Sequence, residues 1–314
     1  MDIKTAGKAL DTIVEQIIAP QVGRNSLAKL VGYVEYAGDP NSNLTPEFIG
    51  QKCFDTTNGI FYIATAVTST SWANLAADIQ GGGNVATNTA YGTSTLAVNT
   101  TGANNTALGY QALDVNTTGA SNTGVGSGAL GANTTGVDNV AVGSQALVAA
   151  TVATGNTAVG KSAADAVTTG VNNTAIGLNA LGAETTGIQN VAIGKDALLV
   201  QVGASSNVAI GAFAMDANTT GANNVAVGLD SLGGNTTGAG NTAIGLSSLK
   251  ANTTGVDNTA VGRDALLSAT VANSNTSVGA FSSDAITTGI NNTAVGAGAL
   301  GAETTGIRNT AIGY

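Results

Sequence analysis

Small, apolar and polar residues recur with a strict period of 17 residues along most of this chain. The consensus reads N-[TV]-A-[VIL]-G-x-x-A-L-x-x-N-T-T-G-[AVI]-x, and its positions are numbered 1 to 17 from the first Asn. The first five positions have the two-residue alternation of a β-strand, with positions 2 and 4 on one face and positions 1, 3 and 5 on the other. The Asn-Thr-Thr-Gly segment at positions 12–15 has the composition of a turn. A period without insertions predicts similar coils stacked in one dimension.

Position 1 is Asn in all 14 windows of the repeat. Identical amides that stack in register can hydrogen-bond to the copies above and below them. We therefore predict a structural Asn ladder. Its members are Asn88, Asn105, Asn122, Asn139, Asn156, Asn173, Asn190, Asn207, Asn224, Asn241, Asn258, Asn275, Asn292 and Asn309.

Each coil is expected to contain two short strands and two turns. The aliphatic residue at position 4 and the Leu at position 9 are expected to point into the coil. Two or three buried aliphatic residues contribute roughly 1.5–3 kcal/mol each before entropy is subtracted, which is adequate only for a stack. With strands about 4.8 Å apart, the stack would span roughly 65 Å.

The Ala and Gly columns at positions 3 and 5 predict a smooth second face. Small side chains permit another backbone to approach closely, whereas a single thin roll would leave this face uncovered. We therefore predict a homotrimer in which three chains pack around a common axis with the small residues nearest to it.

The segments before the repeat have a different character. Residues 1–20 predict an N-terminal helix, because apolar residues recur at alternating spacings of three and four before Pro20. Residues 21–80 predict a small β-rich attachment domain with a strand over 30–36 and a hairpin over 54–64, in which Asn58-Gly59 forms a tight turn. A Gly-rich linker over 81–87 leads into the solenoid of residues 88–314.

Composition narrows the possible functions. The chain has 44 Gly, 4% aromatic and 9% charged residues, which is unlike an ordinary compact domain. The net charge is −9 and no basic patch is present, which argues against nucleic-acid binding. Cys53 is the single cysteine and fits a small buried side chain, and there is no His. The N-terminus does not resemble a signal peptide, and no apolar stretch is long enough for a membrane span.

No catalytic, cofactor-binding or metal-binding residues are predicted. Asp138, Asp165 and Asp216 are sporadic and form no column of the kind that calcium-binding rolls require. The triple glycine at 81–83 lacks the Lys-Ser/Thr of a phosphate-binding loop. Carboxylates from three chains could meet, although no motif marks such a pair. The Thr columns also raise ice binding, but the Thr-Thr pairs fall in a predicted turn.

The N-[TV]-A-[VI]-G core over residues 88–314 resembles the repeat of the YadA-like head of trimeric autotransporter adhesins. That resemblance implies a left-handed parallel β-roll of three chains, although the period of 17 is longer than is usual there. The segment from Thr45 to Gln51, with those over 54–59 and 62–64, is similar to a small β-module of bacteriophage tail-fibre and other virion proteins. Together, the two resemblances imply a protein with an N-terminal module that attaches to a virion, followed by a trimeric shaft.

The sequence therefore predicts an all-β, trimeric solenoid of 14 coils with a small N-terminal α+β attachment domain. We expect a non-enzymatic virion fibre, such as a phage tail-fibre shaft, that binds other virion proteins through its N-terminal domain. The alternatives are a capsid decoration fibre and an adhesin whose solenoid surface binds host polysaccharide. The sequence reaches Tyr314 in the middle of a repeat, so a tip protein, a further segment or a host glycan is expected at that end.

Overall fold

The computed structural model describes residues 33–36, 52–55, 60–64, 72–74, 85 and 87–314. The chain divides into two compact units, Met1–Gly81 and Gly82–Tyr314, and each is described separately. The predicted helix over 1–20 and all but two residues of the predicted linker over 81–87 lie outside the described residues.

In the first unit, four strands form a sheet in the order β1-β2-β3-β4. They are β1 (Tyr33–Tyr36), β2 (Lys52–Asp55), β3 (Ile60–Ala64) and β4 (Trp72–Asn74). The predicted hairpin is present as the antiparallel pair β2–β3, in which Asp55 pairs with Ile60. The predicted Asn58-Gly59 turn lies outside the described residues.

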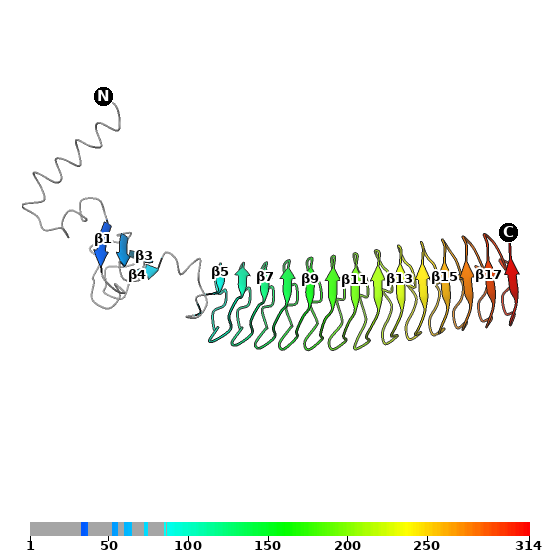
Figure 1. Cartoon of the computed structure of the whole chain (residues 1–314), viewed down its shortest axis with the longest axis horizontal. Coiled ribbons are helices and arrows are strands. Elements are labelled where there is room, and N and C mark those ends of the chain that lie inside the picture. The colour runs from blue at the N-terminus through cyan, green and yellow to red at the C-terminus, as the bar shows by residue number, and fades with distance from the viewer. Residues whose placement is uncertain (1–32, 37–51, 56–59, 65–71, 75–84, 86) are drawn as a thin grey trace, which may run out of the picture. The chain divides into compact units, whose positions relative to one another are not determined.

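The second unit is a parallel β-solenoid with turns of roughly 17 residues, as the sequence predicted, but it has about 13 turns and not the 14 coils expected, because the last window over 309–314 holds only six residues. Fourteen strands stack in sequence order and in register, so that each residue pairs with the residue 17 positions further on (Figure 1). The strands are β5 (Thr89–Tyr91), β6 (Thr106–Leu108), β7 (Thr123–Val125), β8 (Val140–Val142), β9 (Thr157–Val159), β10 (Thr174–Ile176), β11 (Val191–Ile193), β12 (Val208–Ile210), β13 (Val225–Val227), β14 (Thr242–Ile244), β15 (Thr259–Val261), β16 (Thr276–Val278), β17 (Thr293–Val295) and β18 (Thr310–Ile312).

Each coil contains one strand of three residues, at positions 2–4, and not the two strands expected. Apart from isolated bridges such as Thr154 with Val171, the rest of the coil consists of turns and bends. These turns still bond between coils. Thr117 N–H, for example, donates to Thr134 O at 2.9 Å. Backbone hydrogen bonds between coils therefore continue around the coil, although the turns form no second β-strand.

The strand faces the opposite way from the prediction. Ala at position 3 is buried, as in Ala158 and Ala175, whereas the aliphatic residue at position 4 faces outward, as in Ile176 at 38% exposure. The predicted inward Leu at position 9 is confirmed, with Leu181 fully buried. The reason is steric, because the interior of one coil already holds Leu and Asn side chains, and position 3 has only small residues, Ala in twelve coils, Gly124 in one and the buried Ser277 in another. The small residues are thus interior and are not available to pack around a three-fold axis.

Left-handed backbone at three positions of the coil produces its tight turns. Positions 7, 9 and 17 have φ between about +45° and +61° wherever they are not Gly, as in Asp196, Leu198 and Ser206. None of the residues found there is β-branched, because branching at Cβ disfavours this conformation most strongly. The repeat therefore uses Leu, and not Val or Ile, for its largest core residue.

Gly at position 5 is required by close stacking. Gly143 has a φ of +139°, and a Cβ there would lie within 2.3 Å of the carbonyl O of Gly160 in the next coil. This distance explains why position 5 is Gly in every window.

Candidate functional site

The predicted Asn column lies inside the coils. Its members are buried except for the half-buried Asn309. The backbone N–H of Asn258 donates to Asn241 Oδ1 at 3.0 Å, and the side-chain Nδ2 of Asn258 donates to the same oxygen at 3.1 Å. Asn258 Nδ2 also donates across the coil to Ala272 O at 2.7 Å. Each amide thus joins neighbouring coils and also ties the strand to the turn opposite.

A second ladder at position 12 was missed by the sequence analysis. Asn116 Nδ2 donates to Asn99 Oδ1 at 2.8 Å and to Gly119 O at 3.0 Å. The same carbonyl accepts from Asn105 Nδ2 of the first ladder at 2.9 Å. The signal was visible in the sequence, because Asn occupies position 12 in two runs of three consecutive coils, but the Asn-Thr-Thr-Gly segment was interpreted only as a turn.

The second ladder is interrupted where position 12 is not an amide. Ala150 and Val167 break it once, and Ala269 and Ile286 break it again. Among the described residues, Asn133 Oδ1 and Asn252 Oδ1 are buried without a hydrogen-bond partner, each in the coil that precedes a break. Position 12 therefore divides the coils into blocks.

Glu184 and Gln201 begin one of these blocks, and both are fully buried. Glu184 Oε1 accepts the backbone N–H groups of Thr185, Thr186 and Gly187 at 2.8, 2.9 and 2.6 Å, and that of Gly203 at 2.8 Å. Gln201 Nε2 donates to Glu184 Oε2 at 2.9 Å. These donors compensate a carboxylate that has been removed from water.

Gln201 also connects the two ladders. Its Oε1 accepts from Asn207 Nδ2 at 2.8 Å and from Asn218 Nδ2 at 3.0 Å. All of these polar groups are inside the solenoid, so they hold the rod together and present no chemistry to a ligand.

The outer face of the 14-stranded sheet is uncharged and combines aliphatic side chains with Thr hydroxyls. It consists of Thr or Val at position 2 and of Val, Ile, Leu or Tyr at position 4 in every coil. Position 4 is half-buried to exposed, with Ile210 at 38%, Ile244 at 40% and Leu108 at 45%. The structure thus leaves a continuous uncharged surface along the whole stack, and this surface is β-branched throughout from β7 to β18.

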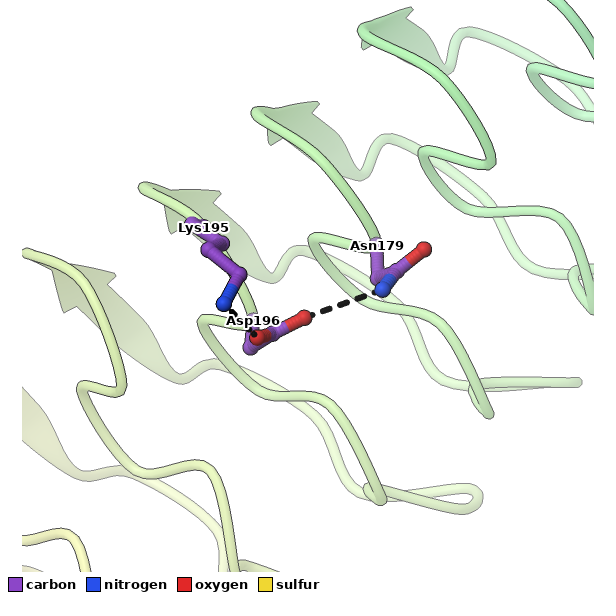
Figure 2. A network of polar contacts seen from close by, with 3 residues as sticks. All are labelled: Asn179, Lys195 and Asp196. Atoms are coloured by element: carbon purple, nitrogen blue, oxygen red, sulfur yellow. Dashed lines mark hydrogen bonds and ion pairs between the residues drawn. The ribbon is translucent and has the colours of Figure 1, made fainter.

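Charged side chains gather along a different edge, at positions 6, 7 and 10, which is called here the polar edge. It includes Asp114, Lys161, Asp165, Lys195, Asp196, Asp216, Asp230, Lys250, Arg263, Asp264 and Asp284. Figure 2 shows one network on it, in which Asp196 accepts from Asn179 Nδ2 at 3.0 Å and pairs with Lys195 at 3.3 Å. The polar edge therefore offers ionic and polar contacts, whereas the sheet face offers apolar side chains and Thr hydroxyls but no charge.

The polar edge contains a shallow depression of about 570 Å³ lined by Asp216, Asp230 and Lys250 with small neighbours. Lys250 Nζ lies 2.5 Å from Asp230 Oδ2, and this hydrogen bond and charge raise the pKa of Lys250. Partial burial, followed by the negative charge of Asp230, raises the pKa of Asp216. Two half-exposed rings adjoin the edge, with Lys195 Nζ 4.9 Å from the ring centre of Phe213 and Arg263 Cζ 4.4 Å from that of Phe281.

The Asp residues singled out from the sequence do not come together. Asp165 and Asp216 lie at position 10 in coils three apart, and Asp138 is exposed at position 17. Within the described ranges, no group of three or more Asp, Glu or Cys side chains could hold a metal ion. The described part of the chain also contains no apolar helix of the length that a membrane span needs.

Searches against protein-family models, curated proteins and solved structures found no match to this chain.

Proposed function

We propose that this chain is a structural fibre, in which the solenoid is a rigid shaft and the N-terminal unit is the attachment module. The observation that carries this proposal is the uncharged face along β5–β18, on which an unbroken column of large apolar side chains at position 4 is partly exposed. A shaft of this kind needs partners that cover that face, and further copies of the same chain, as a homotrimer, meet the requirement. In this proposal the outer sheet face packs around the three-fold axis, in place of the small residues at positions 3 and 5.

The size of this surface supports packing between copies. Full burial of one Val, Ile or Leu side chain removes on the order of 100 Å² from water. About 40% exposure at position 4 and a smaller share at position 2 then leave on the order of 1,000 Å² over the stack, which is comparable with the roughly 800 Å² that each partner buries in a standard complex. Val and Thr also interchange at position 2, as in Val191 and Thr174, which fits a surface packed by shape.

The virion setting of the proposal is supported by the N-terminal resemblance. The segments over 45–51, 54–59 and 62–64 are similar to the virion β-module, and part of them forms the β2–β3 hairpin. In this proposal the N-terminal unit binds other virion proteins, and the shaft projects toward the host surface. A phage tail fibre is the form that we favour.

Native mass spectrometry of the intact chain tests the assembly. We expect the mass of three chains, and we expect a variant with both Ile193→Glu and Ile244→Glu to give one. Thr237→Glu is the matched control, because Thr237 is exposed but lies away from the sheet face. A parent protein with the mass of a single chain would exclude the trimer.

Electron microscopy of purified particles with a solenoid-specific antibody tests the virion setting. Label at the tail supports a tail fibre, and label over the capsid supports the decoration fibre. Particles without label would contradict both.

The polar edge favours a second candidate, an adhesin that binds a host polysaccharide along the shaft. The polar edge offers the carboxylates that line its depression and, at Phe213 outside that lining, a half-exposed aromatic ring, and sugars bind to both kinds of group. Glycan-array binding that is lost in Phe213→Ala and retained in Thr237→Glu would favour this function. An array without signal for the parent would exclude the glycans that it displays.

A further inference from the structure

Most coils of this solenoid are interchangeable, which creates a problem of register. Positions 1, 3, 5 and 9 are nearly identical from coil to coil, so a strand could pair with almost any other strand of the stack. Segments of uniform pattern specify register weakly and are prone to slip. A slip by a whole coil would keep the Asn ladder, the Leu column and every strand hydrogen bond.

One junction breaks this equivalence. In an ordinary coil, the position 13 N–H donates to the position 13 carbonyl of the next coil, as Thr117 does to Thr134. In the coil of Glu184, the position 13 N–H donates to the Glu184 carboxylate instead. The next coil adds two more donors to this carboxylate, Gly203 N–H and Gln201 Nε2. Gly203 has a φ of +72°, so this coil has a turn unlike Asn-Thr-Thr-Gly.

We infer that Glu184 and the Gln201–Gly203 turn form a register lock, a complementary pair that fixes which coil follows which. An Asn-Thr-Thr-Gly coil does not complement Glu184, because its position 14 N–H already donates forward, as Thr220 does to Thr236. Conversely, an Asn side chain in place of Glu184 would be too short to reach Gly203 N–H. The lock is a specificity device, and it is independent of the fibre proposal.

The recurrence of one half of the lock supports the inference. The segment over 182–188 is repeated at 301–307, and Glu303 Oε1 again accepts the N–H groups of Thr304, Thr305 and Gly306, at 3.0, 3.0 and 2.6 Å. The carboxylate with its three local N–H donors is therefore a reproducible unit of this chain.

Two whole-coil deletions of equal length test the lock in the full chain. Removal of residues 190–206 places Glu184 against the coil of Asn218, whereas removal of residues 224–240 places Asn218 against Asn252 and preserves the amide ladder. We expect the second deletion to keep the thermal midpoint of the parent within about 3 °C, and the first to lower it by at least about 5 °C. Comparable midpoints for the two deletions would overturn the inference.

The substitution Glu184→Asn distinguishes a lock from a generally important residue. In the intact chain it should lower the midpoint and speed amide hydrogen exchange at Thr185, Thr186 and Gly187. In the chain without residues 190–206 it should raise the midpoint, because the substituted amide then meets an Asn-Thr-Thr-Gly coil. An effect of the same sign in both backgrounds would sink the proposal, because complementarity requires the sign to reverse.

Discussion

At the scale of the residue, backbone conformation selects the side chains of this repeat as strongly as hydrophobicity does. Position 9 is buried, so hydrophobicity alone would admit Leu, Ile or Val. The left-handed φ of that position excludes the two β-branched residues, as Leu249 at +53° illustrates. The absence of β-branched residues from this column could have been noticed in the sequence, and it would have predicted the conformation.

We predict that Leu249→Ile destabilises the solenoid although it conserves volume and hydrophobicity. A β-branched side chain at positive φ costs about 1–3 kcal/mol. Ile286→Leu is the matched control, because Ile286 is also fully buried but is not among the residues with positive φ. Urea titration followed by circular dichroism should show a clear loss for Leu249→Ile and a smaller one for Ile286→Leu, and equal losses would refute the conformational argument.

A second residue-scale prediction concerns acid stability. The pKa of Asp216 is raised by burial and by Asp230, so between the ordinary and the raised pKa the folded state binds more protons than the unfolded state. Stability contributed at this site therefore falls as pH rises through that window. Asp216→Asn should stabilise the protein at pH 7, by about 0.3–0.5 kcal/mol because the site is partly solvated.

Thermal unfolding at pH 7 and at pH 3 measures this effect. The gain from Asp216→Asn should disappear at pH 3, where the carboxyl is protonated in both states. Asp138→Asn is the control, because Asp138 is exposed and Asn occupies the equivalent position 17 at Asn172. A gain that persists unchanged at pH 3 would show that charge is not its cause.

At the scale of the element, the face of the strand that points inward depends on the space that the other side chains of the coil leave free. The two-residue alternation located every strand of the solenoid, since it depends on local sequence. It did not reveal which face is inside, because either Ala158 or Val159 satisfies the alternation. That choice depends on the volume that Leu and the two amide columns already occupy, which only the closed coil determines.

The two Asn ladders, one predicted and one missed, show the same limit of an interpretation based on local sequence patterns. Identical Asn residues at position 1 led directly to a stacking prediction. The Asn at position 12, which is interrupted by other residues, was overlooked because it had been explained as part of a turn. Glu184 lay outside both patterns, and its partners Gln201 and Gly203 differ from the consensus at the places where they bind it.

The donor-to-acceptor direction of the hydrogen bonds in the Asn ladder gives a prediction at the scale of the element. Asn241 Nδ2 donates to Asn224 Oδ1 at 3.2 Å and to Gly255 O at 2.8 Å. Asn241→Asp would replace these donors with a buried carboxylate that faces two acceptors, at a cost of about 3–5 kcal/mol. Asn241→Ala leaves the partners unsatisfied and should cost less, about 1–3 kcal/mol. Chemical denaturation orders the variants, and a mild effect of Asp at pH 7 would contradict the assigned directions.

At the scale of the whole molecule, the solenoid behaves as a sum of coils and the junctions between them. Each coil contacts its two neighbours, so stability depends on local interfaces and length can change in units of a coil. The sequence itself contains a seven-coil echo, because residues 133–139 match residues 252–258. Asn133 and Asn252 also leave the same buried oxygen without a partner, so their surroundings match as well.

This equivalence allows a seamless excision. Removal of residues 133–251 joins Ala132 to Asn252 and reproduces the native junction over seven residues, while Glu184 and Gln201 are removed together. We expect the shortened chain to fold with an unchanged circular dichroism signal per solenoid residue. Small-angle scattering should show a shaft shorter by about 34 Å, because seven coils are lost at about 4.8 Å each.

Excision of residues 142–260, equally long, is the matched control. It cuts within the strands β8 and β15 and should also fold, because the register of every column is preserved. Excision of residues 133–242 is not a whole number of coils and should abolish the cooperative unfolding transition. If that third variant folded as well as the others, the shaft would not depend on in-register stacking. If all three failed, the coils would not be the independent units that a shaft of variable length requires.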